Sequence, residues 1–241
     1  YMNGGFTKHD IVQSITVDDK GIQTTMPVNA DGSSNFYWNF NLYKQYKNNP
    51  KFIYSWSIGG NFNYNRNRFL FNNNGSWQSN LNYSTRGSIN LNWKDLVEYN
   101  TSYSPGQNVT QYTNTAFKKI RINYRYWDNE LIIRWPKHII WETQATYTYN
   151  SRISAGNPKE ITIWNAAVNF TMLKDETGVL KLSVFDILNR AKNISSYATR
   201  NMLTTSQSNI LSQYFMATFT YNVRAAGVKK KIGGRERFFF F

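Results

Sequence analysis

Long stretches of the chain alternate between apolar and polar residues, and this period of two constrains the fold more than any other feature. From Trp77 to Trp93 the odd positions carry most of the apolar residues and the even positions are polar. Successive side chains of a strand point to opposite faces of a sheet, so the stretch predicts a strand with one apolar and one polar face. The odd positions are Trp77, Ser79, Leu81, Tyr83, Thr85, Gly87, Ile89, Leu91 and Trp93.

The same alternation recurs along most of the chain, and no apolar stripe at helical spacing competes over a comparable length. The polar positions are mostly Asn, Ser, Thr and Gln. We therefore predict an all-β protein made of long antiparallel strands. Ten strands are expected, at 8–17, 34–46, 51–65, 76–93, 96–104, 114–135, 139–150, 160–173, 178–188 and 212–223.

The connections between these strands alternate in length. Tight turns are expected near Asn49, Lys94, Pro136 and Glu176. Alternating short turns and long loops is typical of an up-and-down β-barrel in an outer membrane. Several strands exceed the 9–11 residues needed to cross a bilayer, so we expect them to project beyond it. The long loops are expected at 18–33, 66–75, 105–113, 151–159 and 189–211.

The strand expected at 114–135 changes the face of its apolar residues partway along. Ile120 and Ile122 share one face near its start, whereas Leu131 and Ile133 share the other parity near its end. One extra residue in a strand shifts all later side chains to the opposite face. We therefore predict a β-bulge at Trp127–Asn129.

Composition removes several other classes of protein. The chain has no Cys, which excludes a disulfide scaffold and a thiolate zinc site. Aromatic residues make up 17% of it, too many for a disordered chain. It contains no run of 18 apolar residues, so a transmembrane helix is excluded. A soluble β-sandwich remains as an alternative, but its strands are shorter and its outward face carries Lys, Glu and Thr.

The C-terminal part carries motifs that resemble a known family. The segments Gly178–Asn189, Thr205–Asn209 and Tyr214–Tyr221 look like the end of TonB-dependent-receptor-like outer-membrane barrels of the Bacteroidota type, and Pro27–Gly32 resembles a loop of such barrels. The resemblance spans most of the chain and is strongest over 160–223. It implies a barrel of roughly 22 strands around an N-terminal plug, of which this chain is the C-terminal part. A self-contained ten-strand barrel is the alternative.

The resemblance implies a function at the cell outer membrane, the energised uptake of a solute. The alternative is a structural barrel that acts as a scaffold subunit without transport. Implied partners are membrane lipid and lipopolysaccharide, the plug or the remaining barrel strands, TonB and a surface lipoprotein. An enzyme is not expected, since His9 and His138 are the only histidines and both are placed on the periplasmic side. No cofactor, metal or nucleic acid is expected.

A few charged residues are candidates for the inner wall of the barrel. Two interpretations of them are open: steering of an anionic solute, or pairing with one another or with a missing plug, which we favour. In the motif that contains Asp186 and Asn189, the carboxylate is either a ligand group or a cap of the following turn, and we favour the cap. The wall candidates are Arg86, Lys119, Arg121, Arg125 and Glu142.

The chain divides into barrel strands at 1–223 and a basic tail at 224–241. The tail contains Lys229–Lys231 and Arg235–Arg237, for which a solvated periplasmic segment is favoured over contact with nucleic acid or anionic lipid. It ends on Phe238–Phe241, for which we have no physical account. The net charge of +14 suits contact with lipopolysaccharide phosphates.

The polar positions are mostly small, which suits a wide wall better than the filled interior of a narrow barrel. We therefore expect the strands at 8–17 and 212–223 not to pair with each other. Each is expected to pair with a strand outside this sequence, from the same polypeptide or another chain.

Overall fold

The computed structural model describes residues 1–153, 156–173, 176–198, 203–208 and 211–222. The fold is all-β, as predicted, with fourteen strands among these residues. Twelve belong to one sheet and two form a separate hairpin. The strands are β1 (Met2–Thr7), β2 (Asp10–Val17), β3 (Gln23–Ala30), β4 (Ser33–Asn49), β5 (Phe52–Phe71), β6 (Asn74–Trp93), β7 (Val97–Tyr112), β8 (Ile120–Ile133), β9 (Ile139–Asn150), β10 (Glu160–Met172), β11 (Gly178–Phe185), β12 (Asn193–Ala198), β13 (Leu203–Ser208) and β14 (Tyr214–Tyr221).

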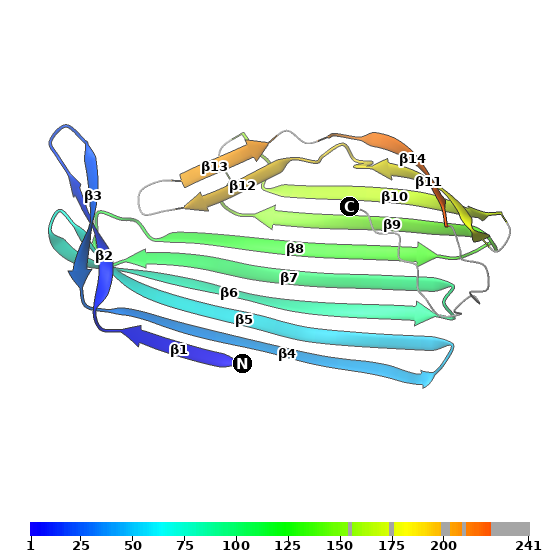
Figure 1. Ribbon diagram of the computed structural model, residues 1–241, viewed down its shortest axis with the longest axis horizontal. Helices are drawn as coiled ribbons and strands as arrows, with labels where there is room; N and C mark the ends of the chain where they lie inside the picture. Colours follow the sequence, from blue (N-terminus) through cyan, green and yellow to red (C-terminus); the bar gives the residue numbers. More distant parts are fainter. Residues whose placement is uncertain (154–155, 174–175, 199–202, 209–210, 223–241) are drawn as a thin grey trace.

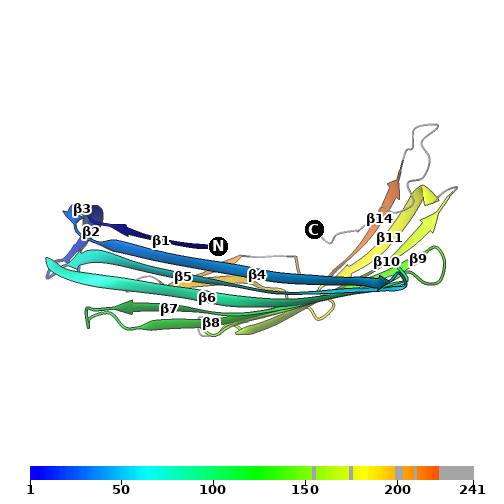
Figure 2. The same cartoon turned by 90° about the horizontal axis from the view of Figure 1, so that it is seen from below.

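The main sheet follows the order β1-β4-β5-β6-β7-β8-β9-β10-β11-β14, and all neighbours on this path are antiparallel. From β4 to β11 each strand pairs with the next one in the chain, which confirms the up-and-down topology. The sheet is curved into a trough whose two edges rise on the same side (Figures 1 and 2). It is open, since β1 and β14 are not paired with each other. The described strands therefore do not close into a barrel by themselves.

One end of the trough carries the tight turns at the predicted places. These turns follow β4, β6, β8 and β10, and we call this the short-turn end. Lys94 and Asp95 adopt positive φ angles of 52° and 56° in the turn after β6. The opposite end holds the longer connections and is called the long-loop end.

Several predicted loops at the long-loop end are strand instead. The expected loop 66–75 belongs to β5 and β6, whose hairpin turns through only Asn72 and Asn73. The expected loop 105–113 belongs almost entirely to β7, and 189–211 contains the hairpin β12–β13. These segments lack apolar alternation, so their sequence resembled loop. Pairing with a neighbouring strand satisfies their backbone regardless of side-chain pattern.

The N-terminal prediction is also corrected. The strand expected at 8–17 is β2, and it pairs inside this chain, antiparallel to β3 and parallel to β5 at Ser14↔Leu70. The edge of the sheet is β1 instead, which pairs with β4 from Met2↔Trp38 to Thr7↔Ser33. The expectation that 8–17 and 212–223 do not pair with each other is confirmed in the described residues.

The predicted β-bulge in β8 is wrong. The register is continuous with β7 from Thr110↔Ile120 to Val97↔Ile133, and it is continuous with β9 as well. Ile120 and Leu131 therefore lie on opposite faces of a regular strand. The apolar side chains of β8 change face along the strand, because at the long-loop end the opposite face of the sheet is the buried one.

That burial comes from a small core at the long-loop end, where the β2–β3 hairpin lies beside β5. Phe69 is 1% exposed, and Val12 and Ile15 of β2 are also buried. Phe117 packs edge-on against Phe69 at a centroid distance of 5.8 Å. Ile120 is buried on the same face, which explains the apolar parity at the start of β8. The hairpin is thereby fixed to the sheet by apolar contacts.

Candidate functional site

The sheet keeps one polar and one apolar face across its full width, because the register never slips between the central strands. A polar row starts at Ser55 and continues through Asn90, Asn100, Glu130 and Gln144. The adjacent row on the opposite face is almost entirely apolar. It contains Tyr54, Leu91, Tyr99, Leu131, Thr143, Ala166, Val184 and Phe215.

Burial on these two faces is the reverse of that in a water-soluble protein. Trp93 and Trp141 on the apolar face are 48% and 49% exposed, and Phe215 is 79% exposed. On the polar face Glu98 and Glu142 are only 4% and 5% exposed. Side chains converge on the inside of a curved sheet and spread apart on the outside. The burial thus identifies the polar face as the concave one.

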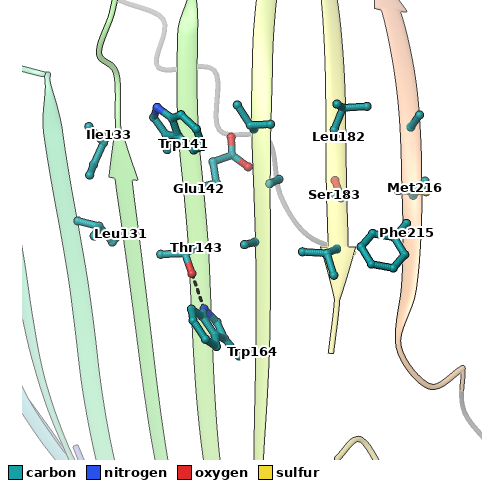
Figure 3. A pocket seen from close by; sticks show the side chains of 15 residues that line it. Leu131, Ile133, Trp141, Glu142, Thr143, Trp164, Leu182, Ser183, Phe215 and Met216 are labelled. Atoms are coloured by element: carbon teal, nitrogen blue, oxygen red, sulfur yellow. Dashed lines mark hydrogen bonds between the residues drawn. The ribbon is translucent and has the colours of Figure 1, made fainter. Parts of the chain in front are cut away.

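Several polar atoms on the apolar face are paired with one another. The indole N–H of Trp127 donates to Thr101 Oγ1 at 3.1 Å, and that hydroxyl donates to Asn129 Oδ1 at 2.9 Å. The indole N–H of Trp164 donates to Thr143 Oγ1 at 2.7 Å (Figure 3). These groups therefore do not depend on water for their hydrogen bonds.

The polar face contains a buried charge network that crosses β9, β10 and β11. Glu142 Oε2 accepts a hydrogen bond from Lys181 Nζ at 3.0 Å, and Glu142 Oε1 accepts one from Asn169 Nδ2 at 3.0 Å. Asn169 is fully buried, and the Lys181 side chain is 13% exposed. An ion pair at this depth is held by its partners and hydrogen bonds rather than by solvent.

A second network of the same kind lies near the turn after β6. Glu98 Oε1 accepts hydrogen bonds from Arg134 Nη1 at 3.0 Å and from Asn92 Nδ2 at 3.3 Å. Arg134 also donates to the carbonyl oxygen of Asp95 at 3.1 Å. Both networks connect strands at the short-turn end, and each compensates a buried carboxylate with a cation.

The remaining charges of the polar face are bound by neutral groups. Asp128 Oδ1 accepts from Thr146 Oγ1 at 2.8 Å and from Gln144 Nε2 at 3.2 Å. Glu130 Oε2 accepts from Asn100 Nδ2 at 2.8 Å. The result is a wall of amides and hydroxyls whose carboxylates already have partners.

Of the predicted wall residues, two lie on the polar face. Glu142 is in the buried network, and Arg86 is exposed and donates to Ser102 Oγ at 3.1 Å. Arg121 and Arg125 lie on the apolar-face parity, together with Trp127, because β8 has no bulge. Lys119 precedes β8 and is exposed. The five residues thus do not form one cluster.

Asp186 forms the bonds expected of a turn cap. Its Oδ1 accepts from the backbone N–H of Arg190 at 2.9 Å, and its Oδ2 accepts from that of Ala191 at 2.7 Å. The N–H of Asn189 donates to the carbonyl of Asp186 at 2.8 Å. Both residues of the motif have φ of 50°. They shape the chain as it leaves β11.

The apolar face is hollowed near its short-turn end, between β8 and β14 (Figure 3). The hollow has a volume of about 770 Å³. Trp141 and Trp164 line it, with Leu182 and Phe215 opposite them (Figure 3). Most of its lining continues the apolar face, and Glu142 and Ser183 of the polar face also border it.

Neither histidine lies in the networks of the polar face. His9 Nδ1 is 2.9 Å from Asp31 at an exposed position, and His138 Nδ1 is 3.6 Å from Glu176 near the short-turn end. The prediction that both lie on one side is wrong, since His9 follows β1 at the long-loop end. No group of His, Asp or Glu side chains in the described residues has the arrangement of a metal site. In the same residues no helix has the length and apolarity needed to span a membrane.

Five residues of the buried networks were missed by the sequence reasoning: Asn92, Glu98, Arg134, Asn169 and Lys181. A signal for Lys181 was present, since it is the only charged residue of β11 and shares the polar parity. The sequence alone does not reveal that it meets Glu142 across an intervening strand. The predicted tail 224–241 and its Phe238–Phe241 end lie outside the described residues. No protein-family model, curated protein or solved structure matches the chain.

Proposed function

We propose that this chain is part of an outer-membrane β-barrel of the TonB-dependent receptor type, which takes up a solute with energy supplied across the periplasm. The observation that carries the proposal is the inverted burial of the two faces. A sheet in lipid presents apolar side chains outward and polar ones inward. The internally paired Trp127 and Trp164 indoles suit the same setting, where water does not satisfy polar groups.

The open sheet supports a larger assembly. In lipid the backbone of a sheet is satisfied only when its edges are joined, so β1 and β14 require further strands. The polar face between them is lined by small residues such as Ser55, Ser57, Ser88 and Ser102. Small side chains leave a wide lumen that is suited to a separate plug or a passing solute.

Strand length supports a projection from the membrane. β5 and β6 have 20 residues each, or about 68 Å at about 3.4 Å per residue. A bilayer is crossed by 9–11 residues of a tilted strand. In this proposal the long-loop end extends outside the cell and the short-turn end faces the periplasm.

A scaffold subunit without transport is the second candidate function. The specific observation in its favour is the small core around Phe69 and Phe117, which holds the β2–β3 hairpin against β5 at the long-loop end. A fixed projection of this kind provides a surface for another protein. A barrel of this kind is compatible with either function. The phenotype of a deletion strain separates solute uptake from a scaffold role.

The first test is localisation of the complete protein. After cell fractionation it should be in the outer membrane, and its electrophoretic mobility should change between unheated and heated samples. Recovery in the soluble fraction would refute both candidates. Growth of a deletion strain on single nutrients then separates them. Uptake predicts losses shared with a strain that lacks TonB, whereas a scaffold predicts loss of co-purifying outer-membrane proteins without any nutrient defect.

A further inference from the structure

Four arginines lie on the apolar-face parity toward the long-loop end, and we call them the arginine belt. They are Arg66 and Arg68 of β5 and Arg121 and Arg125 of β8. Their pairing sets the face: Arg68 lies opposite Trp77, which begins the alternating series of β6. None of the four points toward the polar wall.

The belt begins where the apolar series ends. On β5 this face carries rings and one aliphatic residue from Phe52 as far as Tyr64, except at Gly60, and the next two positions of that face are Arg66 and Arg68. On β8 it is apolar from Ile133 to Trp127 except at Asn129, and arginines occupy two of the three remaining positions. In a barrel the apolar band marks the hydrocarbon, so the belt lies at the headgroup level.

Three of the four guanidinium groups lie against aromatic rings, and three of the four arginine side chains are exposed. Arg66 Cζ lies 4.4 Å from the Trp77 ring centroid and Arg68 Cζ lies 6.0 Å from it. Arg125 Cζ lies 5.2 Å from the Tyr149 ring centroid. Arg66, Arg121 and Arg125 are exposed. Stacking on a ring leaves the N–H edge of a guanidinium available for an anion.

No carboxylate in the described residues forms an ion pair with any of the four arginines. Glu160 pairs in register with Tyr149, the ring beside Arg125, and Asp31 is hydrogen-bonded to His9. Four cations without an ion-paired carboxylate leave the belt positive. Its charge is therefore not explained by pairing within the sheet.

We propose that the arginine belt binds the phosphate groups of a glycolipid headgroup in the outer leaflet of the membrane. This inference rests on the proposed barrel and names the lipid chemistry that its outer surface recognises. Guanidinium groups bind phosphate through two parallel hydrogen bonds, which a lysine does not reproduce. An apolar surface directly below the belt accommodates the acyl chains of the same lipid.

The test uses the complete protein in lipid nanodiscs and measures binding of diphosphorylated lipid A. The test variant is Arg66→Gln with Arg125→Gln. Its matched control is Lys44→Gln with Lys94→Gln, which removes two cations that also stack on rings but lie at the short-turn end. Loss of two basic groups at a lipid surface should weaken binding about 30-fold in the test variant. The control should bind like the unmodified protein.

Two further measurements decide the source of the anion. Dephosphorylated lipid A should bind to the unmodified protein about as weakly as the intact lipid binds to the test variant. Inorganic phosphate at millimolar concentration should not displace the lipid. Equal losses in both variants, insensitivity to dephosphorylation or displacement by inorganic phosphate would each overturn the proposal. Its failure is distinct from failure of the barrel proposal, since both variants are first recovered from the outer membrane with a heat-dependent mobility.

Discussion

At the scale of single residues, the carboxylates described on the polar face of the sheet each have a defined hydrogen-bond partner. Glu142 is the clearest example, because Lys181 and Asn169 reach it from two other strands. An ion pair that is removed from water stabilises little by itself, but a carboxylate left without its cation is strongly destabilising. Such a pair therefore fixes which strands lie next to one another more than it raises total stability.

We expect Lys181→Met to lower the free energy of unfolding by about 3 kcal/mol, because it leaves Glu142 buried without a cation. Urea titration in detergent micelles, followed by tryptophan fluorescence, measures the change. The double variant Glu142→Gln with Lys181→Met should regain most of the loss. If the double variant is as unstable as the sum of the two single variants, the two side chains are not coupled.

Neighbouring residues of one strand should respond oppositely to charge. Ile89→Arg on the apolar face should cost about 2–4 kcal/mol, because it places a charge toward lipid. Asn90→Arg on the polar face should cost much less, since it meets Asn100 and water. Folding from urea into vesicles gives both values. Equal costs would show that the two faces of β6 do not differ in environment.

At the scale of single elements, β5 and β6 form one long hairpin with a two-residue turn. Asn72 and Asn73 have positive φ angles of 47° and 62°, which is the geometry of a type I′ turn. Asn tolerates the left-handed region better than other non-glycine residues. The 20-residue strands thus run uninterrupted from the short-turn end to an exposed tip.

This hairpin gives a direct test of orientation. We expect a cysteine at Asn74, beside the turn, to react with a membrane-impermeant thiol reagent in intact cells. A cysteine at Asn49, at the short-turn end, should react only after the cells are opened. Both positions are exposed in the structure, so the difference reports the membrane and not burial. The opposite pattern would invert the proposed topology.

At the scale of the whole molecule, the sheet has two unpaired edges. β14 pairs with β11 on one side only, and β1 pairs with β4 on one side only. An edge with free N–H and C=O groups is avoided in soluble proteins and is not tolerated in lipid. The proposed barrel therefore needs more strands than the described residues provide.

In the complete protein, we expect the amides of 214–221 to exchange hydrogen as slowly as those of β10, because a further strand should cover the open edge of β14. Hydrogen exchange followed by mass spectrometry measures this in nanodiscs. Fast exchange at every second amide of 214–221 would mean that the edge stays free and that the barrel closes differently.

Much of this molecule follows from the alternation alone. The alternation predicts the all-β fold and the turns at the short-turn end. It also predicts on which face of the sheet Ser55 and Trp93 lie. These features depend only on the period of two and on local backbone geometry. The period of two is visible in any short stretch of the sequence. The hairpin that turns at Asn72 was not predicted, because the ends of β5 and β6 near this turn do not alternate between apolar and polar residues.

The tertiary structure decided what depends on neighbours distant in the chain. Only strand pairing shows that β1 and not β2 forms the edge, that Glu142 meets Lys181, and that Ile120 is buried against a small core without any bulge in β8. Each of these contacts depends on the register between strands tens of residues apart. A side-chain pattern specifies the face of a residue, whereas the partner across the strands is fixed only when the sheet forms.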